Sequence, residues 1–398
     1  MTGVLPLKRV AQVLAGQSPP SSEVKDLSQG LPFLQGNAEF GSEFPAARYE
    51  CQSPPKCARA GDVLLSVRAP VGALNIADQP YGIGRGLASI RARDAHFRFI
   101  WWWLHSQRSA LDAVSTGTTY SAVTAEDIEQ LKFPQFTLDE QRRIADFLDI
   151  EATRIDHLDG LATSACRVLA ERRHVLLERV IMTDNVPLQK LFRRLRLLRD
   201  GTHQPPPRTS TGVPLLTARN VSSGFLKLTD QDTFVSTDDA AILEASLRLE
   251  YRDILLSVKG TVGAAAIVPP EFQRVVLDRN LALLRPNQSL LNEWLLWVLR
   301  TQNLQEQMSL SVTAAAQPGL PLGAIRELRI PSIDIEEQKE QVRKIEAQEQ
   351  ELVDLESKIQ SQRYLLAERR QALITAAVTG HIDVTTVTGL VATGDTAT

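Results

Sequence analysis

The chain has 398 residues, of which 43% are hydrophobic and 23% are charged. This balance is typical of an ordinary globular protein, and it excludes a wholly disordered chain, a collagen-like chain and a small disulfide scaffold. The length allows two or three domains. We expect no membrane span, because no apolar stretch reaches about 18 residues, and no secretory signal, because the N-terminus lacks an apolar core. Three cysteines do not form a disulfide framework, so we expect a cytoplasmic protein.

The formal net charge of −3 does not by itself exclude nucleic acid as a partner. Residues 1–137 and 186–335 carry a small excess of basic side chains, whereas residues 138–185 and 336–398 carry an acidic excess. Nucleic-acid binding depends on local basic patches rather than on the total charge. DNA binding therefore stays open at this point.

The sequence contains a tandem repeat. The segment GDVLLSVR at residues 61–68 recurs as RDILLSVK at 252–259, and RGLASIR at 85–91 recurs as RNLALLR at 279–285. Farther along, LAERR occurs at both 169–173 and 366–370. Such collinear matches indicate two related halves, roughly 1–185 and 186–380.

The front part of each half is predicted to be mixed α/β. Short apolar runs at 62–67 and 253–258, bounded by turn residues, predict equivalent strands. Residues 97–113 and 290–307 predict helices. Proline-rich turns follow Ser18 and Gln204.

The back part of each half is predicted to be one long helix. Apolar residues recur every seven positions in both halves, which is typical of a coiled-coil seam: Leu148, Ile155, Ala162, Leu169 and Leu176, then Ile345, Leu352, Ile359, Leu366 and Leu373. The second seam position is charged, which suits a helix pair that also contacts other protein: Glu349, Glu356, Arg363 and Arg370. Asp139 is placed to cap the start of the first long helix, and Asp334 that of the second.

Two equal helices made by tandem repetition can pack antiparallel within one chain. We therefore expect an α+β fold of two similar mixed α/β domains, joined by two long helices in an intramolecular antiparallel coiled coil with a pseudo-twofold axis. The expected boundaries are 1–137 for the first domain, 138–185 for the first helix, 186–334 for the second domain, 335–380 for the second helix, and 381–398 for a flexible tail. Such an arrangement suits a protein that recognises a two-part site whose halves lie at a fixed spacing.

The sequence contains no motif that predicts catalysis. There is no GxxxxGK[ST] loop for ATP, no [DN]PP[FY] loop of an amino-methyltransferase, and no clustered histidines and cysteines for zinc. Glutamate–x–lysine strings occur on the predicted long helix at 337–339 and 356–358, where surface pairing explains them. We expect no catalytic residue and no metal site in this chain.

Several longer motifs resemble one family. FPQFTLDEQRRI at 133–144, IPSIDIEEQ at 330–338, RQALITAAVTGHIDV at 370–384 and the GDVLLS strand are similar to segments of specificity subunits of type I restriction-modification systems. The resemblance implies a non-catalytic DNA-binding subunit that reads a bipartite, asymmetric site. It also implies two methyltransferase subunits and restriction/translocase subunits as partners, with S-adenosylmethionine, ATP and Mg²⁺ bound by those partners. A glutamine often follows the small-residue loop in this family; Gln317 fits, but the first half has Tyr120 there.

Candidate DNA contacts are basic and polar residues on predicted loops, since phosphates bind Lys and Arg whereas bases are read by Arg, Asn, Gln, Ser or Thr. In the first half they are Gln17, Ser18, Arg68, Arg85, Thr118, Thr119 and Tyr120. In the second half they are Thr202, His203, Gln204, Arg208, Arg219, Asn220, Lys259, Arg279 and Gln317. An arginine-rich run precedes the second set and is expected near DNA, with a solvated amphipathic helix as the alternative interpretation: Arg193, Arg194, Arg196 and Arg199.

Two of these assignments leave a choice open. Arg68 and Lys259, like Arg85 and Arg279, are basic at equivalent positions in both halves; shared phosphate binding and structural ion pairs both explain this. The small-residue loops 115–121 and 311–320 either approach DNA or close each domain onto its helix.

A coiled-coil scaffold that only assembles proteins is the main alternative function. The divergence of the loops between the two halves favours a reader of two different sequences, because a scaffold does not need distinct loops. The missing motifs argue against a stand-alone nuclease or methyltransferase.

Overall fold

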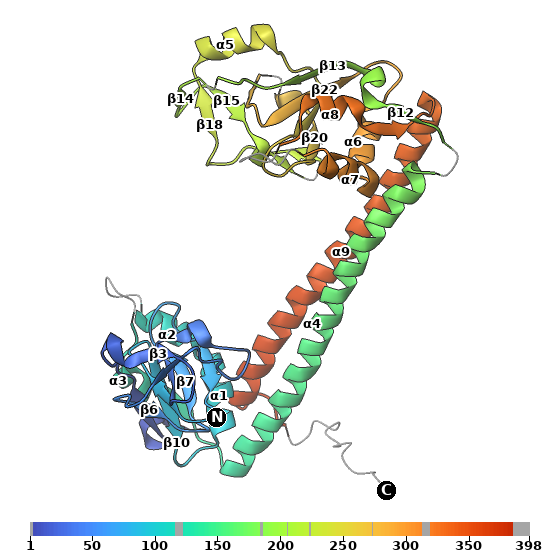
Figure 1. The fold of residues 1–398 in the computed structure, drawn as a ribbon. Helices are drawn as coiled ribbons and strands as arrows, with labels where there is room; N and C mark the ends of the chain where they lie inside the picture. The colour runs from blue at the N-terminus through green and yellow to red at the C-terminus, as the bar shows by residue number, and fades with distance from the viewer. Residues whose placement is uncertain are drawn as a thin grey trace. The chain divides into compact units, whose positions relative to one another are not determined.

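The computed structural model describes residues 3–115, 122–183, 186–204, 206–222, 224–272, 274–312 and 319–384. The chain forms two compact units: Met1–Ala162 with Gln360–Thr398, and Thr163–Ile359. Each unit therefore contains one β-rich domain and a segment of both long helices, α4 (Leu138–Ile181) and α9 (Ile335–Val378) (Figure 1).

The first unit is built on an antiparallel sheet of order β2-β10-β7-β8. Its strands are β2 (Ala11–Ala15), β10 (Leu87–Ala92), β7 (Val63–Ser66) and β8 (Leu74–Ile76). Helix α1 (Phe97–Ser106) packs its tryptophans Trp101, Trp102 and Trp103 into the core, where each is at most 5% exposed. The GDVLLS segment thus forms the central strand that the sequence predicts.

A second sheet of order β3-β5-β4-β9-β6 completes the domain. It consists of β3 (Val24–Asp26), β5 (Tyr49–Cys51), β4 (Pro32–Leu34), β9 (Tyr81–Ile83) and β6 (Cys57–Ala58), and β4 and β9 are parallel. Strands β1 (Val4–Pro6) and β11 (Lys132–Pro134) pair near the long helix, and two short helices follow α1: α2 (Arg108–Ser115) and α3 (Ala125–Glu129).

The second unit repeats this layout. Its central sheet has the equivalent order β13-β22-β19-β20: β13 (Leu195–Asp200), β22 (Leu281–Pro286), β19 (Ile254–Ser257) and β20 (Ala265–Ile267). Another sheet has the order β14-β18-β15-β21, with β15 and β21 parallel: β14 (Arg208–Thr209), β18 (Thr233–Val235), β15 (Val213–Leu216) and β21 (Val276–Leu277). The remaining elements are β12 (Leu188–Lys190), β16 (Val221–Ser222), β17 (Phe225–Leu226), α5 (Thr237–Ser246), α6 (Asn292–Arg300), α7 (Gln302–Leu310), α8 (Leu322–Glu327) and β23 (Arg329–Pro331).

Local predictions differ from the structure in two places. The helices expected at 97–113 and 290–307 are each broken in two, after Ser106 and after Arg300. The arginine-rich run does not form a helix; it forms a short 3-10 turn and strand β13. Most of its side chains bond within the unit: Arg194 to the Ser289 carbonyl, Arg196 to Glu250, and Arg199 to the Ser246 carbonyl.

The two long helices are α4 (Leu138–Ile181) and α9 (Ile335–Val378), each 44 residues long. Thr137 rather than Asp139 caps α4, because its Oγ1 accepts the Glu140 N–H while Glu140 accepts the Thr137 N–H. Asp334 caps α9 as predicted, accepting the Glu337 N–H at 2.9 Å.

Within each unit the helix segments run antiparallel. In the first unit Arg363 pairs with Asp159 and Arg370 with Asp156. In the second, Arg173 pairs with both Glu349 and Glu356. The charged seam positions thus form ion pairs between the helices. The long helices pack together beside β-rich domains, which confirms the predicted α+β class.

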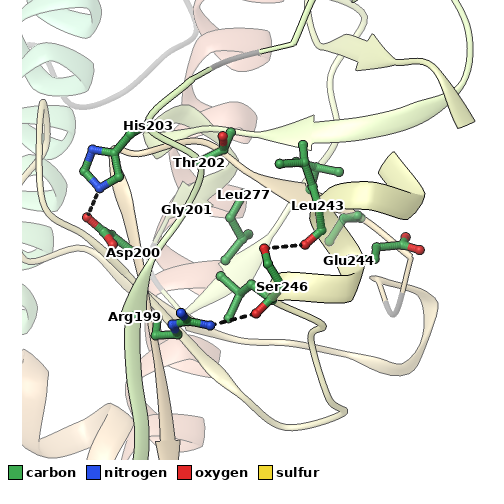
Figure 2. A pocket seen from close by; sticks show the side chains of 12 residues that line it. Arg199, Asp200, Gly201, Thr202, His203, Leu243, Glu244, Ser246 and Leu277 are labelled. Atoms are coloured by element: carbon green, nitrogen blue, oxygen red, sulfur yellow. Dashed lines mark hydrogen bonds and ion pairs between the residues drawn. The ribbon is translucent and has the colours of Figure 1, made fainter. Parts of the chain in front are cut away.

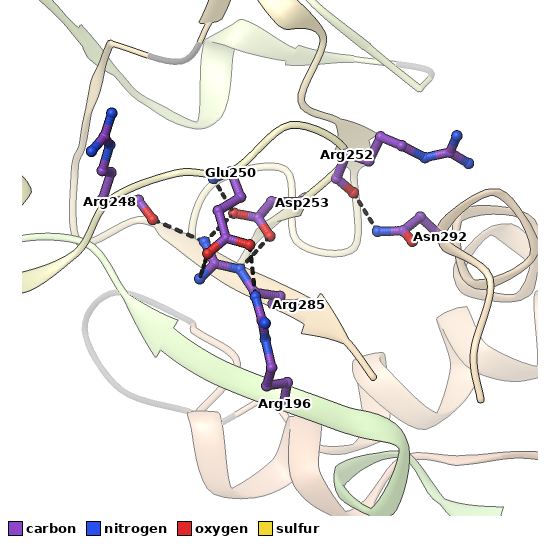
Figure 3. A network of polar contacts seen from close by, with 7 residues as sticks. All are labelled: Arg196, Arg248, Glu250, Arg252, Asp253, Arg285 and Asn292. Atoms are coloured by element: carbon purple, nitrogen blue, oxygen red, sulfur yellow. Dashed lines mark hydrogen bonds and ion pairs between the residues drawn. The ribbon is translucent and has the colours of Figure 1, made fainter. Parts of the chain in front are cut away.

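A buried aspartate links two central strands in both domains. Asp253, 2% exposed, accepts two bonds from Arg285, and Glu250 also pairs with Arg285 and Arg196 (Figure 3). Its equivalent in the first domain is Asp62, which binds Arg91 in the same way. Hydrogen bonds to Asp253 raise the pKa of Arg285.

The residue before each aspartate has left-handed backbone: Gly61 at φ 84° and Arg252 at φ 70°. A side chain in this region costs about 1–2 kcal/mol. An added Cβ at Gly61 meets nothing within 4 Å, so Gly61→Ala should lower the free energy of unfolding by about 1 kcal/mol through backbone strain alone. Arg252→Gly should lower the free energy of unfolding by less than Gly61→Ala does, because glycine relieves the left-handed backbone, although the change removes the ion pair with Glu293. Urea unfolding of both variants checks this; equal losses would contradict it.

Candidate DNA interface

In the first domain two loops cross at the edge of the parallel strand pair. The loop after β2 bonds to the loop between β9 and β10: Gly16 N–H donates to the Leu87 carbonyl and Gln17 N–H to the Ile83 carbonyl, each at 2.9 Å. Ser18 Oγ accepts the Arg85 N–H at 3.2 Å and the Gln35 amide at 2.7 Å. The crossing therefore places Gln17, Ser18, Arg85 and Gln35 together.

The crossing depends on glycine. A Cβ at Gly16 would collide with the carbonyl oxygens of Gly84 and Ile83. Because these are backbone atoms, they have no rotamer that relieves the collision. Gly16 is therefore required by the close approach of the two loops.

The second domain contains the same crossing. Gly201 N–H donates to the Leu281 carbonyl at 3.0 Å and Thr202 N–H to the Leu277 carbonyl at 2.9 Å. A Cβ at Gly201 would collide with the Leu277 and Asp278 carbonyls. Arg279 stands exposed in the same loop as buried Asp278, at the position equivalent to exposed Arg85. We call residues 16–18 with 84–86, and 201–203 with 278–280, the crossing loops.

The second crossing lies beside a hollow of about 220 Å³ (Figure 2). His203 projects from it and its Nε2 lies 2.7 Å from Asp200, while Arg199 donates to the Ser246 carbonyl of α5. Thr202 Oγ1 bonds to the carbonyl of exposed Gln204 at 2.8 Å. The first domain has Gln17, Ser18 and Gln35 at its crossing instead, so the two crossings differ in side-chain chemistry.

A second pair of equivalent basic residues follows the central strands β7 and β19. Ser66 Oγ donates to the Arg68 carbonyl and Ser257 Oγ to the Lys259 carbonyl, each at 3.0 Å. Arg68 forms an isolated β-bridge with Ala122, directly after the first small-residue loop, and Lys259 forms one with Gly319, near the end of the second. Neither these two side chains nor Arg85 and Arg279 form an ion pair with any residue that the structure describes.

The remaining predicted contacts fall into three groups. Arg208 and Arg219 are exposed, and Arg208 donates to Thr233 Oγ1 at 2.7 Å. Asn220 is 1% exposed, and its amide bonds to Thr217, Lys227 and Asp232; it stabilises a turn, and we withdraw it as a DNA contact. Thr118, Thr119, Tyr120 and Gln317 lie outside the described residues.

Sequence reasoning missed Gln35. Parallel pairing of β4 with β9 brings it to the crossing, because Phe33 lies opposite Gly82 and Leu34 opposite Ile83. The repeat carried a signal, since GLPFL at 30–34 recurs as GVPLL at 212–216. Gln35 directly follows the first copy, and Arg219 lies just after the second.

Neither metal clusters nor membrane helices are found in the described ranges. No group of three or more His, Cys, Asp or Glu side chains there could hold a metal ion, and no helix there is long and apolar enough to cross a bilayer.

Comparison with known proteins assigns part of the chain to a family. Residues 4–157 match the type I restriction modification DNA specificity domain. A stretch of 136 residues is 39% identical to the MjaX type I restriction enzyme specificity subunit of Methanocaldococcus jannaschii, and covers 34% of this chain and 32% of that protein. Residues 4–157 thus belong to the type I restriction modification DNA specificity domain family, and the chain is similar to specificity subunits of type I restriction enzymes.

Longer alignments extend this likeness over most of the specificity subunit. The EcoBI specificity subunit of Escherichia coli is 20% identical over 375 residues, which cover 85% of this chain and 77% of that protein. A solved chain from a study of type I restriction-modification complex assembly has the same fold, with TM-score 0.74, 19% identity and 95% and 98% of the two chains covered. HsdS of Thermoanaerobacter tengcongensis gives TM-score 0.57 at 20% identity, with 95% and 97% covered.

Proposed function

We propose that this specificity subunit reads a bipartite, asymmetric site in double-stranded DNA, with one half-site bound by each β-rich domain. It recruits two methyltransferase subunits and, in the full complex, restriction/translocase subunits. S-adenosylmethionine, ATP and Mg²⁺ are bound by those partners, and this chain itself catalyses no reaction. We place the complex in the cytoplasm, in keeping with the free thiols of Cys51 and Cys57.

The observation that carries the proposal is the pair of crossing loops. Both domains present an exposed arginine, Arg85 or Arg279, on the same backbone scaffold. A contact common to two domains that read different sequences must be independent of sequence, which fits a phosphate. The side chains beside each arginine differ, which fits the reading of different bases.

Exposed apolar residues on α4 support a protein partner in each unit. Leu158 and Leu161 are 47% and 54% exposed in the first unit, and Val168 and Val175 are 55% and 64% exposed in the second. An apolar stripe on a helix that its own chain leaves uncovered is typical of a docking surface. One stripe per unit agrees with two methyltransferase subunits.

Arg85→Ala and Arg279→Ala should each weaken binding of the complex to specific and to non-specific DNA alike. Loss of one phosphate contact should lower the slope of log affinity against log salt by about one unit. The base preferences of both half-sites should stay unchanged. Fluorescence anisotropy across a salt series measures the slope, and sequencing of methylated DNA measures the preferences. Lys25→Ala, which removes an exposed basic side chain from β3 of the first domain, is the matched control.

Several results would contradict the phosphate assignment or the reader function. If both arginine variants keep the wild-type affinity and salt slope, the crossing loops do not contact phosphate. If the wild-type complex binds DNA without any base preference, the chain is not a reader, and the scaffold alternative takes its place. Methyl transfer by the purified chain without partners would contradict a non-catalytic subunit.

A further inference from the structure

We infer that Gln35, held by Ser18, reads an adenine in the half-site of the first domain. This inference rests on the proposed function and assigns one base contact within it. The two side chains come from different segments of the chain, and the Gln35 Nε2 to Ser18 Oγ distance is 2.7 Å. Gln35 is exposed and lies beside exposed Arg85, the proposed phosphate contact.

The Gln35 side chain retains hydrogen-bonding groups that match an adenine. A glutamine amide has two N–H donors and one carbonyl acceptor. Ser18 takes one donor, and no other described residue bonds to the Gln35 side chain. One N–H and the Oε1 carbonyl thus make no hydrogen bond to a described residue, and Oε1 packs against Gly84, where an added Cβ would lie 2.6 Å from it. We assign these two groups as the donor and acceptor for the base.

This remaining pair is complementary to the major-groove edge of adenine. Oε1 accepts from the adenine N6 amino group while the N–H donates to N7, a bidentate contact that other bases do not match. The bond to Ser18 fixes the amide plane before DNA arrives, which reduces the entropy lost on binding. Ser18 is itself held by the Arg85 N–H at 3.2 Å. Ser18 therefore supports both Gln35, the proposed base contact, and the backbone of Arg85, the proposed phosphate contact.

The second domain does not repeat this arrangement. Thr217 takes the position of Gln35 after the equivalent strand, and its Oγ1 bonds to Asn220 at 3.1 Å inside a turn. This difference agrees with a base contact specific to one half-site, whereas Arg85 and Arg279 are shared. It also provides an internal control, because the second half-site should not respond to changes at Gln35.

The test uses the full chain assembled with its methyltransferase subunits, and a plasmid library in which every position of both half-sites is varied. Adenine methylation is read by sequencing. Gln35→Ala should reduce the preference for adenine at one position of the first half-site about tenfold to a hundredfold. Ser18→Ala should weaken the same preference several-fold, because the amide stays but is no longer fixed. Gln12→Ala, an exposed residue on β2, should change nothing.

The outcomes separate this inference from the proposed function. A relaxed preference at a single adenine, with the second half-site and the salt slope unchanged, supports the assignment. Unchanged preferences at every first-half position in Gln35→Ala overturn it while leaving the reader function intact. Loss of preference at all first-half positions, or relaxation at a base other than adenine, also overturns it. A wild-type complex without base preference defeats the proposed function itself.

Discussion

Asp62→Ala should destabilise the first unit by about 3–5 kcal/mol, because it leaves a charge without its partner in the protein interior. The Asp62 side chain is 2% exposed and accepts bonds from Arg91, Ser89 and the Arg59 N–H. Arg91 is only 25% exposed, so its guanidinium cannot regain full hydration once the carboxylate is removed. Chemical denaturation followed by tryptophan fluorescence measures the loss, since Trp101, Trp102 and Trp103 lie in this core.

Two further variants give this prediction its controls. Asp26→Ala removes an exposed carboxylate from β3 of the same domain and should change the free energy of unfolding by about 0.5 kcal/mol or less. Asp62→Ala combined with Arg91→Met should cost less than Asp62→Ala alone, because removing both charges leaves none unpaired. A single variant as stable as the wild type would show that the ion pair is not a structural element of the domain.

Gly16→Ala should abolish recognition of the first half-site. The new Cβ meets backbone carbonyls that have no rotamer to adopt, so the two crossing loops must separate. Overpacking of this kind costs about 1–3 kcal/mol, and separation moves Ser18 away from Arg85 and Gln35. The complex should lose discrimination between the wild-type duplex and one with a scrambled first half-site, whereas scrambling the second half-site should still weaken binding.

Gly36→Ala is the matched control for this change. Gly36 lies next to Gln35, and an added Cβ there meets nothing within 4 Å. Its φ of −162° is extended backbone that any residue adopts. This variant should keep the wild-type discrimination. Equal discrimination by Gly16→Ala and Gly36→Ala would mean that the crossing does not form the DNA-reading surface.

The helices and the duplication could be predicted because their signals are periodic and local. Leu148, Ile155, Ile345 and Leu352 recur at heptad spacing, and each is buried. The charged residues at the second seam position suggest contacts with other protein, whereas in the structure each of them forms an ion pair with the other helix. Ion pairs between helices join residues that no local pattern connects.

Candidate site residues were harder to assign from the sequence, because exposure and partners depend on distant segments. Asn220 has the chemistry of a base reader, yet bonds to Lys227 and Asp232 use its amide within a turn. The sequence places the arginine-rich run 193–199 near DNA, but in the structure Arg196 bonds to Glu250 after α5 and Arg199 bonds to the last residue of α5. A side chain that satisfies its hydrogen bonds internally has little left for a ligand, and this cannot be read from residue type.

The sequence by itself determined the tandem duplication, the two long helices and the absence of known catalytic motifs, because repeats, heptads and motifs are encoded in consecutive residues. Only the tertiary structure decided which residues form the crossing loops. Ser18, Gln35 and Arg85 lie on three separate segments, and they meet because β4 pairs with β9 and because Gly16 lets two backbones approach closely. Such a meeting depends on strand register and backbone contact between distant segments, which local sequence patterns do not specify.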